Sequence, residues 1–486
     1  WTPDDSFFHC TCRAISKQLH DFDAMGLAQV VWSTSKMSRE IPPFLFAPLL
    51  QAISNNIARF NPQDCSNTLW GFARQKTAVT PTVVRVALQL VSRAAAVAFR
   101  TKHMEIANIF WAASQLELVI STDIQQQLCA CVDRIVRTLT PQHIAMVLHG
   151  ASVIQLSEAA SQSLQQQIEG TLIEFEPRSL SNALEGCTKI LERQRTDNNG
   201  SAHEAIAPII QQLLQGCRDA MHQFDCRDVT SLVSFVEHVV VDATSSNGSS
   251  DGMTTMIALM GVDDDLKRMV KDRYIAMCSE AQPIDLSRSL RSLVTMNVTM
   301  SPDDITAVQQ RLNTSVSEMQ CLDLCHMLWS HANGGWGIPR KLGRRVMGRC
   351  VEVMPEFTCQ GVSTVLWSLA KVNCGKMLPS FVEKLEEVCD ESTKTKLIWG
   401  AQELASVLWS AAKMNLVKVF ELCVVHHLKS SVIATMNATD TGNVLWSFAT
   451  VWGDDEAKKT QHQTLLVEVR SRMNDDTLLM QMTPGQ

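Results

Sequence analysis

Polar side chains recur at one position along most of the chain, three residues before a position that is most often tryptophan. We call this second position the anchor, with Trp367 as its type example. Ten of the eleven residues in the preceding series are polar, and the series is Gln29, Asn67, Asn108, Met146, Asn182, Thr230, Arg288, His326, Thr364, Ser406 and Asn443. Amides and hydroxyls spaced one repeat apart can hydrogen-bond with successive bases of an RNA strand. We therefore predict a polar ladder that reads bases, made up of Asn67, Asn108, Asn182, Arg288, Thr364, Ser406 and Asn443.

The polar ladder also has a purely structural interpretation. Side chains of these types often hydrogen-bond to nearby loops or helix ends, and in a repeat protein such bonds would hold the repeats in register. Alanine substitutions distinguish the two interpretations, because a register role predicts loss of folding and a reading role predicts loss of RNA affinity.

A basic cluster lies between residues 340 and 349, in the sequence PRKLGRRVMGRC. It consists of Arg340, Lys341, Arg344, Arg345 and Arg349. Spacings of four residues place these side chains on one broad side of a helix, where like charges destabilise the helix unless an anion faces them. We predict a phosphate-contacting surface here, with a merely solvated helix face as the alternative.

No motif of a catalytic or metal site is recognisable. Cys321 and Cys325 share a helical face next to His326, but a fourth ligand is not evident, so packing is the favoured role of this group. The chain has no GxxxxGK[ST] phosphate loop, no HExxH and no GxSxG sequence. We therefore predict a non-enzymatic protein with no cofactor, no metal and no small-molecule substrate.

Composition narrows the class of protein further. The 43 lysines and arginines against 50 aspartates and glutamates give a net charge of -7, so any phosphate contact must be local. The longest apolar runs are too short for a membrane span. Sixteen cysteines without CxxC pairs indicate buried thiols in a reducing compartment. Because the sequence opens at Trp1, a processed leading segment such as a transit peptide is one expectation.

The anchors belong to a repeat that runs through the whole sequence. They are Trp32, Trp70, Trp111, His149, Glu185, Val233, Arg291, Trp329, Trp367, Trp409 and Trp446, most of them 36 to 42 residues apart. The residue before each anchor is apolar, and the residue after it is Ser, Gly or Ala. Self-similarity with this period predicts a solenoid of about eleven helix-turn-helix repeats, an all-α superhelix.

Each repeat is predicted to contain two helices. Around Trp367 the apolar residues have helical spacing on two faces, as a stacked repeat requires. Prolines eight residues before some anchors mark the start of the first helix, and prolines about eleven residues after others mark the start of the second. The second helices are predicted at 82–94, 123–138, 158–172 and 380–389, with a last helix at 457–473.

Two polar insertions divide the array into three parts. The segments 193–201 and 242–252 interrupt the period and are predicted to be loops that project from the solenoid. The predicted parts are therefore residues 1–192 with repeats one to five, 193–300 with divergent repeats, and 301–486 with the last repeats and a short tail.

The unit at 60–73, FNPQDCSNTLWGFA, and the LWS-[LAF]-A cores at 366–370, 408–412 and 445–449 resemble octotricopeptide-type repeats. These are relatives of the helical repeats that precede RAP domains in organellar RNA-processing proteins. The resemblance covers nearly the whole chain and implies an α-solenoid that acts on RNA in mitochondria or plastids. A RAP domain is not recognisable in this sequence.

These observations favour an RNA-binding scaffold of the mitochondrial matrix, with the plastid stroma as the alternative location. The acidic charge favours a structural component of a large ribonucleoprotein, such as the mitochondrial ribosome, with ribosomal RNA and ribosomal proteins as partners. A free RNA maturation, stability or translation factor and a protein-protein scaffold of another organellar complex are the alternatives.

Overall fold

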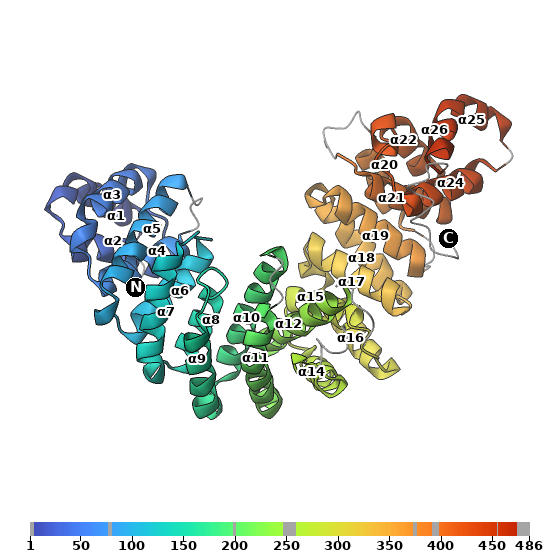
Figure 1. The fold of residues 1–486 in the computed structure, drawn as a ribbon. Helices are drawn as coiled ribbons and strands as arrows, with labels where there is room; N and C mark the ends of the chain where they lie inside the picture. The colour runs from blue at the N-terminus through green and yellow to red at the C-terminus, as the bar shows by residue number, and fades with distance from the viewer. Residues whose placement is uncertain are drawn as a thin grey trace. The chain divides into compact units, whose positions relative to one another are not determined.

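The computed structural model describes residues 4–75, 80–197, 201–245, 259–372, 377–390, 398–453 and 455–473. Within these ranges the chain forms α-helices and short 3-10 helices and contains no strand (Figure 1). The predicted all-α solenoid class is thus confirmed. The chain divides into two compact units, Trp1–Arg273 and Tyr274–Gln486, each described separately below.

Unit 1 consists of two layers of helices. The first layer contains the anchor helices α2 (Ala24–Lys36), α4 (Pro62–Arg74), α6 (His103–Gln115), α8 (Pro141–Gly150), α10 (Pro177–Asp197) and α12 (Cys226–Ser245). The second layer contains α1 (Asp5–Lys17), α3 (Pro43–Asn56), α5 (Pro81–Ala96), α7 (Thr122–Ile135), α9 (Glu158–Thr171) and α11 (Ser201–Ala220). Each helix packs on the next member of its own layer, which is the contact pattern of a solenoid.

Unit 2 repeats the two-layer arrangement. Its first layer contains α15 (Pro283–Thr295), α17 (Cys321–Gly334), α19 (Cys359–Val372), α21 (Ala401–Lys413) and α24 (Ala438–Trp452). Its second layer contains α16 (Pro302–Ser315), α18 (Arg340–Val353), α20 (Pro379–Cys389), α22 (Val417–His426), α23 (Ser430–Ile433), α25 (Glu456–Gln461) and α26 (Gln463–Met473). The boundary between the units falls within α14 (Asp264–Met277).

Short 3-10 helices end many of the second-layer helices and turn the chain back toward the first layer. They are η1 (Leu19–Asp21), η2 (Ile57–Arg59), η3 (Ala98–Arg100), η4 (Val136–Thr138), η5 (Leu172–Glu174), η6 (Met221–Gln223), η7 (Val316–Glu318) and η8 (Met354–Glu356). Among the described residues, no helix is both long enough and apolar enough to cross a membrane.

The helix starts follow local sequence signals. Pro62, Pro141, Pro177 and Pro283 are the first residues of their first-layer helices, as predicted, because the ring suits a turn in which the amide hydrogen has no partner. Asn61 and Asp64 form a reciprocal capping box at α4, with bonds of 2.9 and 3.1 Å. Similar boxes begin α16, α17 and α24.

The apolar and small residues on either side of the anchor pack against each other between repeats. A Cβ on Gly71 would lie 2.6 Å from Val31 Cγ1, and one on Gly150 would lie 2.5 Å from Phe110 Cβ. Gly186 likewise lies against the backbone of Leu148 and His149. The apolar residue of one repeat therefore contacts the small residue of the next, and the small residue sets how closely two helices approach.

The structure corrects one anchor. Ten of the eleven predicted anchors are the ninth residue of their helix, but in α12 that residue is Ser234 and not Val233. Val233 is fully buried like a residue before an anchor, and Thr230 is buried as well. Ser231 therefore replaces Thr230 as the residue three positions before the anchor, and Phe235 occupies the position that is small elsewhere.

Three element boundaries also differ from the prediction. α10 continues to Asp197, and α12 continues to Ser245, so the first parts of the predicted loops 193–201 and 242–252 are helical. Residues 198–200 and 246–252 lie outside the described residues. The helix predicted at 457–473 is interrupted at His462, which separates α25 from α26.

Candidate nucleic-acid interface

The anchors, the polar ladder and the residues four positions after the anchors lie on one side of the first-layer helices. Spacings of three and four residues bring them together along the helix, and we call this surface the anchor face. Most of the flanking residues are buried, whereas the anchor rings remain partly accessible: Trp446 is 45% exposed, and Trp367 and Trp409 are half-buried. The anchor rings thus form part of the surface as well as of the packing.

In unit 2 the anchor rings lie next to cations. Lys371 Nζ is 4.6 Å from the ring centroid of Trp367, and Lys413 Nζ is 4.6 Å from that of Trp409. Arg291, itself an anchor, places its guanidinium 5.7 Å from the ring of Trp329 in the next repeat. These distances are within the range of cation–π attraction.

Further contacts connect neighbouring repeats along this face. Lys371 Nζ donates a hydrogen bond to Asn333 Oδ1 at 3.2 Å, which links α19 to α17. The rings of Trp409 and Trp446 are 6.1 Å apart at an interplanar angle of 38°, which links α21 to α24. Unit 2 therefore presents a series of aromatic rings and cations that extends over several repeats.

Charge is segregated along the helices of this face. In α15, α17, α21 and α24 the only carboxylates are in the first turn, at Asp285, Asp323, Glu403 and Asp440, and α19 has none. Asp323 is buried and accepts a hydrogen bond of 3.0 Å from the hydroxyl of Ser287. Burial raises the pKa of Asp440. In α15, α19 and α21 the cations Arg288, Arg291, Lys371 and Lys413 lie beyond the first turn.

The structure leaves the amides of the polar ladder unpaired. Within the described residues, the side chains of Asn67, Asn108 and Asn443 make no hydrogen bond. They are half-buried, so part of each amide is accessible from the surface. Thr364 differs, because its hydroxyl donates to the carbonyl of Gln360 at 2.7 Å within its own helix. The ladder therefore consists of free amides at some repeats and locally bonded hydroxyls at others.

The anchor face of unit 1 has fewer cations. Arg74 lies 5.2 Å from the ring of Trp70, as the cations of unit 2 do with their tryptophans. At α8 the anchor is His149, which is 8% exposed. Burial, followed by the positive charge of Lys189, lowers the pKa of His149 to about 4. The His149 ring is therefore neutral at pH 7 and is buried in the packing between helices.

The basic cluster lies in the second layer, on α18, and is not part of the anchor helices. Arg340, Lys341 and Arg344 are exposed. Arg345 donates to the carbonyl of Asn313. Arg349 donates to the carbonyl of Met319 at 2.9 Å and pairs with Glu352 at 2.7 Å. The five residues therefore share one helix but not one role, and the phosphate-contacting function of the cluster stays a prediction.

The bond made by Arg349 recurs in other repeats, which the sequence reading missed. A second-layer arginine donates to the carbonyl just before the first-layer helix of its own repeat in the pairs Arg93–Phe60, Arg134–Thr101, Arg273–Phe224, Arg311–Ala281, Arg349–Met319 and Arg472–Met436. These arginines connect the two helices of the hairpin in six repeats. The signal in the sequence is an arginine near the end of the second helix.

Cys321, Cys325 and His326 do not form a metal site in the structure. The two thiols lie near backbone carbonyls of other elements, those of Val353 and Gly361. Burial raises the pKa of Cys325 to about 12, which disfavours the thiolate that a metal would need. Among the described residues, no group of three His, Cys, Asp or Glu side chains is arranged to hold a metal ion.

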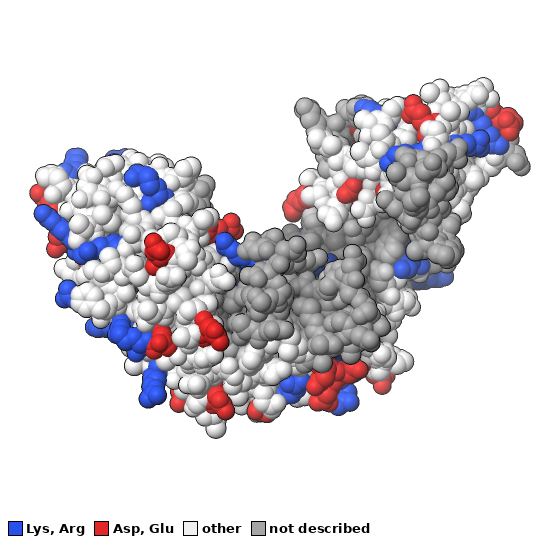
Figure 2. Space-filling model, in the orientation of Figure 1, with Lys and Arg blue, Asp and Glu red and all other residues white. Residues whose placement is uncertain are grey.

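Charged residues are dispersed over the face of the molecule that Figure 2 presents. Figure 2 shows lysine and arginine side chains scattered among uncharged and acidic residues on the face that it presents. This distribution is consistent with the net charge of -7 and restricts any anion-binding surface to local groups of residues.

The fold defines an α-helical repeat protein. No family model matches the chain, and no curated protein matches it either. Among known structures, it is similar to a chain described as a homology model of the full-length AP-3 complex in an intermediate open conformation. That match has 12% identity and a TM-score of 0.30, and it covers 99% of this chain and 82% of the other. At this level it carries no argument about function.

Proposed function

We propose that this chain is a non-enzymatic helical-repeat protein that binds single-stranded RNA along its anchor face. The observation that carries the proposal is the series of rings and cations in unit 2, where Trp329, Trp367 and Trp409 each have a cation at 4.6 to 5.7 Å. Proteins that hold single strands combine aromatic surfaces for the bases with cations for the phosphates. The free amides of the polar ladder add hydrogen-bonding groups to the same face.

The proposed partner is organellar RNA, with ribosomal RNA inside a large ribonucleoprotein favoured. This part of the proposal, together with the mitochondrial matrix or plastid stroma as its location, is supported by the resemblance to octotricopeptide-type repeats. A protein-protein scaffold uses the same half-buried rings differently, by packing them against a partner helix. An RNA-binding protein should bind a single-stranded RNA through these rings. A protein-protein scaffold should bind a partner protein through them and show no affinity for RNA.

The test is fluorescence anisotropy with a labelled, unstructured RNA of about 12 nucleotides, a length within the site sizes of single-strand binders. Trp367→Leu and Trp409→Leu should each weaken binding by about 1–3 kcal/mol, the contribution of one stacked base. The control is Phe99→Leu, because Phe99 is 74% exposed but lies in η3, off the anchor face. If the unsubstituted chain fails to bind RNA even at low salt, the proposed function is wrong.

The polar ladder is tested by replacing Asn67, Asn108 and Asn443 together with Ala. Because their amides have no partner within the described residues, we expect the melting temperature to stay nearly unchanged while RNA affinity falls. A lower melting temperature with unchanged affinity would instead support the register role of the ladder.

A further inference from the structure

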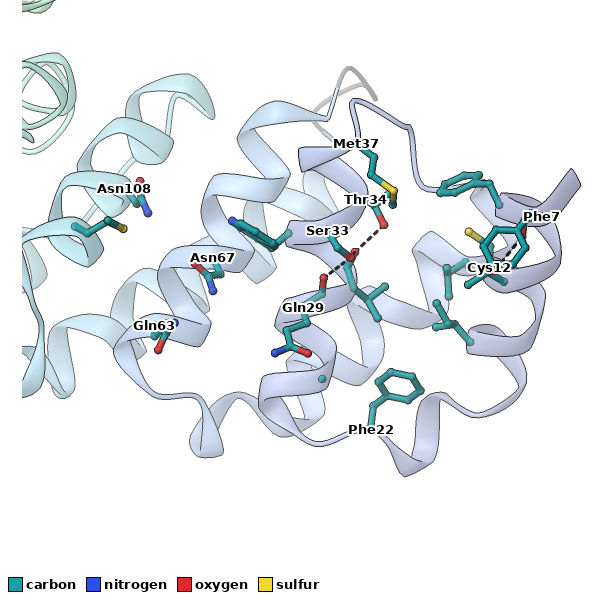
Figure 3. A pocket seen from close by; sticks show the side chains of 18 residues that line it. Phe7, Cys12, Phe22, Gln29, Ser33, Thr34, Met37, Gln63, Asn67 and Asn108 are labelled. Carbon is teal, nitrogen blue, oxygen red and sulfur yellow. Dashed lines mark hydrogen bonds between the residues drawn. The ribbon is translucent and has the colours of Figure 1, made fainter. Parts of the chain in front are cut away.

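A cavity of about 800 Å³ lies in unit 1, where α1 meets the first-layer helices α2, α4 and α6. Its volume is within the range of sites that hold small organic ligands. Figure 3 shows Phe7 and Cys12 on one side of it and Gln63, Asn67 and Asn108 on the other. The cavity is therefore built from both layers at this end of the anchor face.

The walls of the cavity are uncharged. Of the eighteen residues that line it, none is Asp, Glu, Lys or Arg. One wall is apolar and largely aromatic, with Phe7, Phe8, Ile15 and Phe22, while Trp32 belongs to the anchor face. Such walls favour a flat, uncharged group and disfavour a phosphate, which would lose its hydration without a compensating cation.

The other wall carries four amides with free hydrogen-bonding capacity. Within the described residues, the side chains of Gln29, Gln63, Asn67 and Asn108 make no hydrogen bond. They come from three successive first-layer helices and line the same cavity (Figure 3). Each amide offers donors and an acceptor side by side, the pattern that pairs with the N6 amino group and N7 of adenine.

We infer that this cavity binds an unpaired nucleobase of the RNA, with adenine as the base whose edge best matches an amide. The inference rests on the proposed function, since Trp32 and Asn67 belong to both the anchor face and the cavity wall. A strand that follows the anchor face of unit 1 would thus reach the cavity. The base would enter it, and the sugar and phosphate would remain outside.

Adenosine is the probe for the cavity, because it has no phosphate and so gains nothing from the cations of unit 2, and substitutions of the cavity amides separate binding there from stacking on the anchor rings. We expect saturation-transfer NMR on the full chain to show transfer to the base protons of adenosine. Gln29→Leu together with Asn67→Leu should weaken adenosine binding at least about tenfold, since two hydrogen bonds are lost. If the double variant does not fold, Gln29→Leu alone can be used, because Gln29 is exposed. It should lose less adenosine affinity than the double variant.

The matched control is Gln166→Leu, which removes an exposed amide from α9 outside the cavity and should leave adenosine binding unchanged. Adenosine that fails to bind while RNA still binds would overturn the cavity inference and leave the proposed function intact. Adenosine binding that survives removal of the amides would also overturn it, because the base would then be held without the hydrogen bonds that the inference assigns to them. If RNA fails to bind as well, the proposed function itself is wrong.

Discussion

Trp367 is held by two buried neighbours and still presents part of its ring to solvent. Leu366 and Ser368 on either side of Trp367 are fully buried, and the Lys371 ammonium covers part of the ring. A cation at this distance contributes only about 0.5–1 kcal/mol at an exposed site, so it can leave the ring when a base stacks there. The same lysine is then available for a phosphate. A fully buried tryptophan would offer neither contact.

His149 predicts a specific loss of stability in acid. Burial lowers its pKa from 6.5 to about 4, so the folded chain favours the neutral ring. This contribution to the free energy of unfolding is complete above pH 6.5 and is lost as the pH falls from 6.5 toward 4, by up to roughly 3 kcal/mol. His149→Phe should remove this part of the pH dependence.

The measurement is urea unfolding followed by circular dichroism at a series of pH values between these limits. Burial also raises the pKa of Asp64 and Asp440, and their contributions have the opposite sign, because their neutral forms are favoured when folded and add stability as the pH falls. The difference between the variant and the unsubstituted chain cancels them. Identical pH profiles for the two proteins would contradict the role assigned to His149.

At the scale of the elements, the small residue after the anchor determines how helices stack. Gly150→Ala places a methyl group against the backbone of Phe110, so α8 must move away from α6. We expect a loss of about 1–3 kcal/mol, the usual cost of overpacking. Gly170→Ala in α9 is the matched control, since no atom lies within 4 Å of the added group. It should gain up to about 1 kcal/mol from the better helix former.

Both alanine variants can be compared with the unsubstituted chain by their unfolding midpoints. Equal midpoints for Gly150→Ala and Gly170→Ala would show that the helices separate at no cost, and that the apolar and small pair does not control the packing. A lower unfolding midpoint for Gly150→Ala alone would show that the contact between Gly150 and Phe110 sets the distance between α8 and α6.

The sequence was sufficient to predict the helical pairs because their signals are local. Proline starts, capping residues and the apolar and small pair each depend on a few neighbours, and they locate most helices correctly. The assignment was wrong at Val233, where Ser234 resembles the small residue that follows an anchor. The prediction is also wrong at 193–197, where the polarity of RQRTD indicates a loop although arginine and glutamine are good helix formers.

The candidate site was predictable only in part. The ladder positions follow from the repeat, but the cation over each ring depends on side-chain geometry that spacing alone leaves open. Arg349 shows most clearly why spacing alone is not sufficient. Its sequence neighbours suggest a phosphate contact, but in the structure its guanidinium donates to the carbonyl of Met319, 30 residues away. The cavity beside Trp32 also could not be predicted, since it requires α1, a helix before the first anchor.

At the scale of the whole molecule, two sets of four cations are alternative candidates for the phosphate-contacting surface. Arg288, Arg291, Lys371 and Lys413 lie in anchor helices, whereas Arg340, Lys341, Arg344 and Arg345 lie in α18. Replacing either set with glutamine changes the net charge from -7 by four, to -11. A difference between the two variants therefore reports the location of the charges and not their sum.

The measurement is the slope of log affinity for single-stranded RNA against log salt concentration. Each phosphate contact contributes about 0.7 to this slope, so removing the anchor-helix set should lower it by up to roughly 3. The α18 set should change it less, because Arg345 already binds a backbone carbonyl and none of the four lies next to an anchor ring. If the α18 variant instead loses the larger part of the slope, the strand runs along the second layer, and the tryptophans of the anchor face serve packing alone.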